Sequence, residues 1–232
     1  MIKLTIIIPV YNEIKTIEKL IKKILKINIK KQLIIVDDGS SDGTELILKK
    51  YKSKIDKLII HKKNLGKGAA IKSGQRFIKG KYIGIQDADL EYDPRDLKKI
   101  VNAMDQKKLK VMYGSRVLKK NKFKNTQSFT HIIRIWGNVF LTKVSNFLNN
   151  QKLTDAHTCY KVFNSIIFKR IKLKENGFSF CPEITTKISM MNIDIEEFPI
   201  NYIGRTYDQG KKITAFDGLD ALYVLTKYRY FN

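Results

Sequence analysis

Three groups of acidic side chains, each directly after an apolar run, are the residues of this chain best suited to chemistry. Glu13 belongs to the first group, the aspartates of residues 37–44 form the second, and Asp87, Asp89 and Glu91 form the third. One residue separates Asp87 from Asp89, so a turn of the backbone would let both carboxylates face one hard cation. Mg²⁺ or Mn²⁺ prefers oxygen ligands and commonly bridges carboxylates to substrate phosphates. The spacing therefore predicts a divalent-metal site, with a solvated acidic turn as the plainer alternative.

Two strand-to-helix junctions are further candidates for ligand contacts. Asp38 stands at the end of an apolar run, where we expect its carboxylate to accept hydrogen bonds from a base or a ribose. A turn with a helix cap is the structural alternative. Residues 64–70 place Lys67 between two glycines at a helix start whose backbone can approach an anion, so Lys67 is predicted to contact substrate. The segment lacks the Gly-Lys-Ser/Thr ending of a phosphate loop, which disfavours a kinase or an ATPase.

An alternation of strand-like and helix-like segments must position these side chains. Residues 4–10 form a β-branched apolar run typical of a strand covered on both faces, and residues 14–27 repeat apolar positions at helical spacing. Strands alternating with helices predict an α/β fold with a largely parallel sheet, in which ligands bind beyond the carboxyl ends of the strands. The further strands expected are 33–36, 58–61 and 82–86, and the further helices are 44–51 and 67–77.

The second half of the chain is less regular. We expect a helix from Pro94 to about residue 104, a strand at 111–114 and a lysine-rich loop at 119–125. A long helix at 131–148 has apolar residues along one side, which suits either core packing or contact with a membrane. The remaining elements expected are a helix at 183–191, a strand at 195–198 and a terminal helix at 216–229.

The composition narrows the class of protein. The 232 residues carry a formal net charge of +23, from 45 Lys+Arg against 22 Asp+Glu, which would attract phosphates, anionic lipid or nucleic acid. The lysines are spread along the chain and the arginines do not cluster with aromatic residues, so nucleic acid is not the expected partner. Cys159 and Cys181 are expected to be reduced packing thiols. No apolar leader and no run of about 18 apolar residues is present. We therefore expect a cytoplasmic protein that can contact the inner face of an anionic membrane peripherally.

Taken together and in this order, these segments resemble family-two glycosyltransferases of the type A fold. Within that family they are similar to the branch of dolichyl-phosphate mannose and glucose synthases, and the likeness runs from Ile6 to about Arg229. The resemblance implies one domain over residues 1–232 with a mostly parallel central sheet flanked by helices. Residues 1–116 would bind the nucleotide sugar and the metal, and residues 117–232, with the C-terminal helix, would bind the acceptor.

The resemblance also assigns roles to individual residues. Glu91 would be a third metal ligand beside Asp87 and Asp89, although mannose synthases usually carry glutamine at its position. Arg116 would hold phosphate, and Arg205 and Lys211 would close over the phosphates. Arg134 falls at an acceptor contact. The nucleotide pocket and its ribose and diphosphate contacts would be formed by Pro9, Tyr11, Glu13, Val36, Asp38, Asp87, Ala88 and Asp89.

The activity that this implies is inverting transfer of a sugar from a nucleotide-diphosphate sugar, of the GDP-mannose or UDP-glucose type, to a polyprenyl or dolichyl phosphate. A divalent metal and nearby cations would stabilise the diphosphate leaving group. A lipid phosphate is already anionic, so Arg116, Arg134 and Arg205 would orient it and no strong base is needed. Transfer to a saccharide hydroxyl is an alternative, and it would need Asp155 as general base. A non-catalytic nucleotide-sugar or RNA-binding module is an alternative of another class, although the carboxylates would repel RNA.

Overall fold

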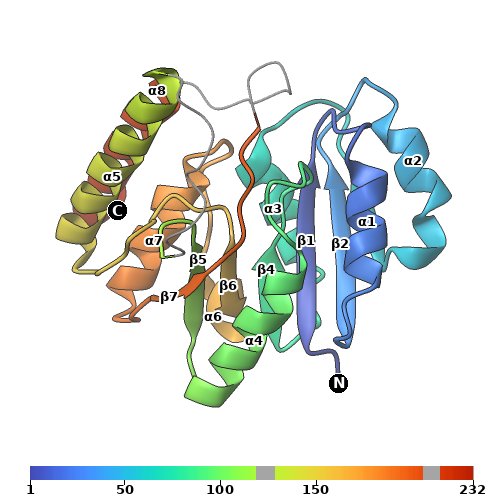
Figure 1. The fold of residues 1–232 in the computed structure, drawn as a ribbon, viewed down its shortest axis with the longest axis horizontal. Coiled ribbons are helices and arrows are strands. Elements are labelled where there is room, and N and C mark those ends of the chain that lie inside the picture. Colours follow the sequence, from blue (N-terminus) through green and yellow to red (C-terminus); the bar gives the residue numbers. More distant parts are fainter. Residues whose placement is uncertain (119–128, 206–214, 232) are drawn as a thin grey trace.

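The structure, a computed structural model, describes residues 1–118, 129–205 and 215–231. It contains one seven-stranded sheet with helices on both faces (Figure 1). The strands are β1 (Leu4–Val10), β2 (Lys31–Asp37), β3 (Lys57–Ile60), β4 (Tyr82–Ile85), β5 (Val111–Ser115), β6 (Lys161–Asn164) and β7 (Glu196–Pro199). Their order across the sheet is β3-β2-β1-β4-β6-β5-β7. Only β6 among these strands runs antiparallel to its neighbours.

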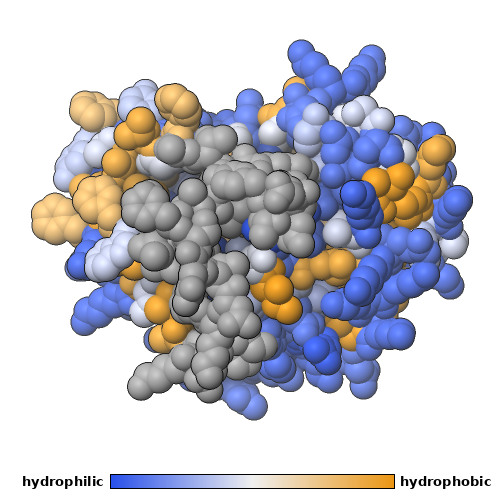
Figure 2. All heavy atoms as spheres, turned by 45° about the horizontal axis from the view of Figure 1, so that its top comes forward, coloured by the Kyte–Doolittle hydropathy of each residue, from blue (hydrophilic) through white to orange (hydrophobic). Residues whose placement is uncertain are grey.

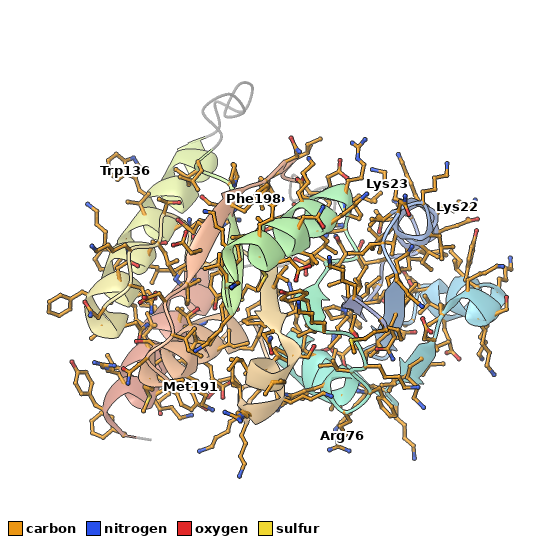
Figure 3. The ribbon with its side chains drawn as sticks, turned by 90° about the horizontal axis from the view of Figure 1, so that it is seen from below. Lys22, Lys23, Arg76, Trp136, Met191 and Phe198 are labelled. Atoms are coloured by element: carbon orange, nitrogen blue, oxygen red, sulfur yellow. The ribbon has the colours of Figure 1, made fainter. Side chains whose placement is uncertain are left out.

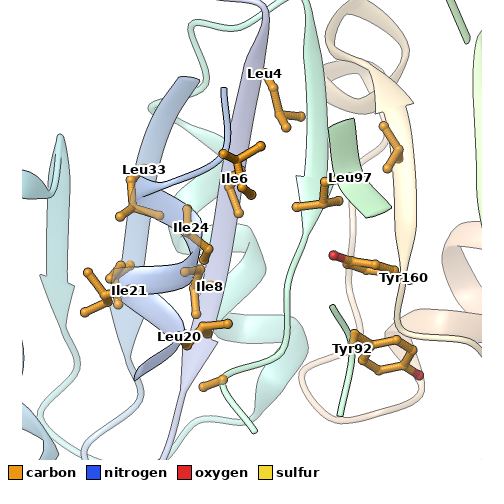
Figure 4. Close-up of a cluster of buried hydrophobic side chains, with 14 of the residues drawn as sticks. Leu4, Ile6, Ile8, Leu20, Ile21, Ile24, Leu33, Tyr92, Leu97 and Tyr160 are labelled. Carbon is orange, nitrogen blue, oxygen red and sulfur yellow. The ribbon is translucent and has the colours of Figure 1, made fainter. Parts of the chain in front are cut away.

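Side chains of β1 build a core on each face of the sheet, because successive side chains of a strand point to opposite faces. Leu4, Ile6 and Ile8 pack into a cluster with the first helix, whereas Ile7 belongs to the cluster on the other face. The first helix, α1 (Ile17–Leu25), buries Ile17, Leu20, Ile21 and Ile24, which is the helical spacing of one apolar stripe (Figure 4).

The helices form two layers. On the face of Leu4 lie α1, α2 (Thr44–Lys50) and α4 (Arg95–Lys107), and a short 3₁₀ helix, η1 (Lys52–Lys54), follows α2. On the face of Ile7 lie α3 (Lys67–Gln75), α6 (Ser165–Arg170) and α7 (Phe180–Met190). The two long helices, α5 (Phe129–Asn149) and α8 (Ala215–Tyr230), pack against α7 and against each other at one end of the molecule. Their side chains are described from residues 136 and 216 onward.

This architecture confirms the predicted α/β fold with its mostly parallel sheet, and each element expected from periodicity is present with small shifts at its ends. Three short elements were not predicted: η1, β6 and α6. The expected lysine-rich loop at 119–125 lies outside the described residues. No helix in the described part of the chain combines the length and apolar character that crossing a bilayer requires.

The sheet topology brings several chain segments to one edge. The parallel strands β1, β2 and β4 end at this edge, and β5 and β7 end there too, because both run antiparallel to β6, as β4 does. The residues that precede β6 reach the same edge because that strand runs the opposite way. Strand order reverses at β1, which pairs with β2 on one side and β4 on the other, and open sheets bind ligands at such a switch point.

Candidate functional site

A cleft of about 400 Å³ opens at this edge of the sheet. Residues after β1, β2, β4, β5 and β7 line it, together with residues that precede β6 and α7. A site assembled from so many strand ends is held by the whole sheet rather than by one loop. The lining side chains that bear charge are Glu13, Asp38, Lys67, Asp87, Asp89, Glu91, Arg116 and Arg205.

The segment after β4 turns sharply at Leu90. Leu90 has a φ of +65°, a left-handed conformation that is uncommon for a residue with a side chain, and the Glu91 amide donates to Asp89 Oδ1 at 3.0 Å. The pKa of Asp89 is raised to about 7 because the carboxyl is buried and because Asp87 and Glu91 lie nearby. Burial and the neighbouring carboxylates therefore both disfavour the ionised form of Asp89.

Arg205 supplies positive charge to these carboxylates. Its guanidinium donates to both carboxylate oxygens of Glu13, at 3.0 and 3.1 Å, and to Asp89 Oδ2 at 3.3 Å. Its backbone amide donates to Glu91 Oε1 at 2.6 Å, and Tyr202 donates to the other oxygen of Glu91 at 3.0 Å. The segment after β7 is thus fastened across the carboxylates that follow β1 and β4.

Lys67 gives the remaining carboxylate its counter-charge. Its ammonium group, at the start of α3, forms an ion pair with Asp87 and lies near the ring faces of Phe178 and Phe180, with 5.8 Å to each centroid. Burial works against the charged lysine, but Asp87 outweighs it and the pKa of Lys67 is raised above its ordinary value. Lys67 therefore stays protonated inside the cleft.

Four backbone amides around the start of α3 are already engaged within the protein. The amides of Leu65 and Gly66 donate to the Asp38 carboxylate, at 3.0 and 2.7 Å. The amide of Gly68 donates to the carbonyl of residue 177, and that of Ala69 to the carbonyl of residue 176. These bonds use four of the amides in the glycine-flanked segment that was expected to approach an anion. The side chain of Lys67 lines the cleft.

Asp38 is held by a histidine that was not predicted to belong to the site. His61 Nδ1 lies 2.6 Å from Asp38 Oδ1, and His61 Nε2 lies 2.9 Å from the Ser73 hydroxyl on α3. Asp38 lines the cleft at the end of β2 with only 3% of its surface exposed. The carboxylate is therefore oriented by three donors before any ligand arrives. Its position at a strand end was readable from the sequence, but the partner, 23 residues away, was not.

Arg116 and Asp155 form a buried pair beside the cleft. Arg116 donates through Nε and Nη2 to the two oxygens of Asp155, at 2.7 Å each, and Asn138 of α5 also donates to Asp155 at 3.2 Å. Burial acts to raise the pKa of Asp155, but Arg116 outweighs it and holds that pKa below its ordinary value. Asp155 is fully buried and does not line the cleft, whereas Arg116 does. This geometry makes Asp155 an orienting partner for Arg116 and a weak proton acceptor.

Three more residues at the cleft were not in the predicted site. The rings of Tyr92 and Tyr202 lie 5.2 Å apart, and the Arg116 guanidinium lies 5.2 Å from the Tyr202 ring. His157 also lines the cleft, and burial, followed by the charge of Lys161, lowers its pKa to about 4, so it is neutral near pH 7. Its Nε2 has no hydrogen-bond partner among the described residues.

Most of the residues predicted from the sequence meet in this one cleft. Val36 is the exception on the donor side, because its side chain is fully buried in the core between the sheet and α3. The side chain of Arg134 and all of Lys211 lie outside the described residues. The predicted residues that line the cleft are Pro9, Tyr11, Glu13, Asp38, Lys67, Asp87, Ala88, Asp89, Glu91, Arg116 and Arg205.

The carboxylates after β4 suit a divalent cation chemically but are not arranged around one. Among the described residues, no group of three or more His, Cys, Asp or Glu side chains has metal-binding geometry. Asp87 is turned to Lys67, and Asp89 to Arg205. Mg²⁺ sites at nucleotides commonly use only one or two carboxylates and complete their shell with phosphate oxygens and water. Asp87, Asp89 and Glu91 all line the cleft and offer carboxylate oxygens, so the chemistry of this donor set fits such an ion.

Comparison with known proteins gives a family match over most of the chain. Residues 5–172 match the model of Glycosyl transferase family 2. A UDP-N-acetylglucosamine–dolichyl-phosphate N-acetylglucosaminyltransferase of Methanococcus voltae is 26% identical over 95% of this chain and 93% of its own length. A dolichyl-phosphate beta-glucosyltransferase of Dictyostelium discoideum is 29% identical over 93% of this chain and 70% of its own.

A solved structure shares the fold. Glucosyl-3-phosphoglycerate synthase from Mycobacterium tuberculosis, crystallised with Mn²⁺, uridine diphosphate and phosphoglyceric acid, superposes with a TM-score of 0.70 at 14% identity. The match covers 99% of this chain and 79% of that one. At this identity the likeness concerns the fold, which is the type A glycosyltransferase fold.

Proposed function

The chain belongs to glycosyl transferase family 2, and from this premise we propose that it transfers a sugar from a nucleotide-diphosphate sugar to the phosphate of a polyprenyl lipid. The observation that carries the proposal is a single cleft in which the acidic turn after β4 faces Lys67, Arg116 and Arg205. Carboxylates suit a metal ion that also binds a diphosphate, and arginines suit a second, anionic substrate. The two relatives named above, whose names specify dolichyl phosphate, support this choice of acceptor.

On the donor side, we assign the nucleotide to the residues after β1 and β2. Asp38 is oriented toward the cleft by His61, and Pro9, Tyr11 and Glu13 line the same wall. Asp87 and Asp89, with Glu91, would hold Mg²⁺ or Mn²⁺, which would neutralise charge on the leaving diphosphate. Lys67 and Arg205 already compensate these carboxylates, so both cations are placed to turn from them to phosphate oxygens when a nucleotide enters.

On the acceptor side, Arg116 is the residue best placed to hold a lipid phosphate. Its bidentate pair with Asp155 fixes the guanidinium plane, and its stacking near Tyr202 restricts it further. A phosphate oxygen is ionised near neutral pH, so the transfer needs orientation more than proton removal. Arg134 and Lys211 would add positive charge there, as the family resemblance implies. We also infer that the reaction takes place at the cytoplasmic surface of a membrane, where such a lipid presents its phosphate.

Product analysis tests the assignment. The purified protein is incubated with GDP-mannose or UDP-glucose, then with other nucleotide sugars, each with Mg²⁺ or Mn²⁺ and polyprenyl phosphate. We expect a prenyl-phosphate sugar whose anomeric configuration is inverted. Asp155→Asn should lower turnover by about 100-fold through misplacement of Arg116, without removing an acidic limb from the pH–rate profile.

Two results would contradict the assignment. Turnover on a soluble saccharide, with no prenyl product from any donor, would favour a hydroxyl acceptor. In that case Asp155→Asn would abolish activity and change the pH dependence, as loss of a general base does. Nucleotide-sugar binding without transfer to either acceptor would favour a non-catalytic module.

A further inference from the structure

The outer faces of α5 and α8 carry large apolar side chains that no described residue covers. On α5 these are Trp136, Phe140 and Phe147, which are 69%, 57% and 86% exposed. Monomeric proteins rarely leave so many aromatic side chains together in water without a function for them. On α8 they are Phe216, Leu219, Tyr223 and Tyr230. The side chains of both sets together are called here the aromatic face.

Helical geometry places each set along one side of its helix. The α5 residues follow a spacing of i, i+4 and i+11, opposite the buried Thr142 and Ser145. The α8 residues follow i, i+3, i+7 and i+14, opposite the buried Ala221 and Val224. Apolar side chains gather at the end of the molecule formed by α5 and α8 (Figure 2), and Trp136 points away from the body there (Figure 3).

We propose that the aromatic face docks this protein onto an anionic lipid bilayer. Tryptophan, tyrosine and phenylalanine on the outer side of a helix suit the boundary between headgroups and acyl chains, where an apolar ring is buried and a polar tip stays wet. The side chains on the opposite side of the same helices are packed in the protein, so the helices would lie along the surface without entering the bilayer.

The charge of the molecule favours lipid over other occupants. A net charge of +23 draws the whole protein toward an anionic surface, and the aromatic face then sets its orientation. Lys143 is exposed within the α5 stripe between Phe140 and Phe147, and Arg229 is exposed beside Tyr230. The carboxylate of Asp220 on α8 accepts a hydrogen bond from Ser179, so it is engaged within the protein. Two copies facing each other through this surface would bring like charges together.

The docking surface is coupled to the acceptor side of the cleft. Asn138 lies on α5 between Trp136 and Phe140 in sequence, yet its side chain turns inward to Asp155, the partner of Arg116. Val117 and Leu118, which directly follow Arg116, are exposed apolar residues. A bilayer against α5 would therefore lie one helix away from the proposed phosphate-binding arginine. This coupling rests on the proposed function, whereas the docking itself does not.

Trp136 provides a direct test because it is the only tryptophan in the chain. The protein is mixed, without substrates, with vesicles of phosphatidylglycerol and phosphatidylcholine in equal parts. We expect the emission of Trp136 to shift to the blue and to be quenched by lipids brominated on their acyl chains. Vesicles of phosphatidylcholine alone should bind the protein much more weakly.

Matched variants assign the binding to this face. Phe140→Ser combined with Tyr223→Ser should lower partition into the anionic vesicles by at least about tenfold, because two buried aromatic contacts are lost. Leu46→Ser combined with Ile166→Ser, which removes equally exposed apolar residues from α2 and α6, should leave partition unchanged. All four residues are exposed, so neither variant should unfold, and circular dichroism checks this.

Three outcomes would overturn the docking proposal: no spectral shift with anionic vesicles, equal loss of binding in both double variants, or a blue-shifted dimer in the absence of lipid. Transfer to a short, water-soluble prenyl phosphate separates this proposal from the proposed function. If that transfer persists while docking fails, only the membrane surface is wrong. If docking holds and no prenyl phosphate is ever glycosylated, only the proposed acceptor is wrong.

Discussion

At the scale of single residues, Arg205 divides its hydrogen bonds among several carboxylates in the cleft. It serves Glu13 and Asp89 through one guanidinium, while its Nε is buried without a hydrogen-bond partner among the described residues and stands 3.9 Å from Glu91. A buried donor without an acceptor costs free energy. The contacts of Arg205 therefore look like those of a resident counter-ion that a more highly charged one can displace.

Arg205→Gln should raise the affinity of the nucleotide-free protein for Mn²⁺ by about tenfold, because a competing positive charge leaves the carboxylates that would hold the ion. Electron paramagnetic resonance of free Mn²⁺ measures this affinity without any turnover. Arg95→Gln is the matched control, since Arg95 also pairs with an aspartate, Asp93, but lies exposed outside the cleft. Equal affinity in the wild type and Arg205→Gln would show that Arg205 does not compete with the metal.

At the scale of elements, the junction before α3 depends on one glycine. Gly66 has a φ of +97°, and a Cβ at this position would lie 2.5 Å from the carbonyl oxygen of Asn176. Its amide also donates to Asp38, so the junction ties the end of β2 to α3 and to the segment before α7. Neither a left-handed turn nor this close approach leaves room for a side chain.

Gly66→Ala should therefore lower the free energy of unfolding by about 1–3 kcal/mol, the usual cost of strained backbone. Gly137→Ala in α5 is the matched control, because a Cβ there meets nothing within 4 Å and alanine is the better helix former. That control should be neutral or stabilising by up to about 1 kcal/mol. Urea denaturation of both variants measures the difference. Equal stability of Gly66→Ala and the wild type would mean that the junction rearranges without strain.

The spacing of buried residues within each element explains which parts of the fold could be predicted from the sequence. Strands such as β1 and helices such as α1 bury regularly spaced residues, so their periodicity reveals them. By contrast, β6 has four residues and buries a lysine, Lys161, whose ammonium donates to the Ala156 carbonyl and lies over the Tyr113 ring. Only Val162 and Phe163 are apolar in this strand, and two residues are too few to show a periodicity, so the strand was missed.

The sequence likewise predicted some residues of the site and missed others. Residues placed by a single strand end, such as Asp38 and Asp89, were found because chain order alone puts them at the edge of the sheet. Val36 was assigned to the pocket by resemblance, but its side chain points into the core. Contacts between distant segments, such as His61 with Asp38 or Tyr202 with Glu91, depend on how strands pair across the sheet. No local pattern carries that information.

At the scale of the whole molecule, the two halves of the chain are interleaved. Strand β6, from the second half, pairs with β4 and β5 of the first, and β7 then pairs with β5. The cleft likewise draws Glu13 and Asp89 from one half and Arg205 from the other. A ligand in this cleft therefore contacts residues from both halves of the chain. Because these residues can move apart only if the sheet opens, ligand binding should stabilise the protein as one unit.

Thermal unfolding with a nucleotide diphosphate and Mn²⁺ tests this coupling. At about 100 times the dissociation constant, binding should add about 2.7 kcal/mol and raise the Tm by roughly 5–10 °C. Because phosphate oxygens would complete the metal shell, the two ligands together should shift the Tm by more than the sum of their separate shifts. Asp89→Asn should abolish this excess while leaving the Tm without ligands within a few degrees, since Asp89 already costs charge repulsion in the cleft. An excess that survives in Asp89→Asn would place the metal elsewhere. Shifts that merely add would separate the nucleotide from the metal, and the carboxylates after β4 would then need another purpose.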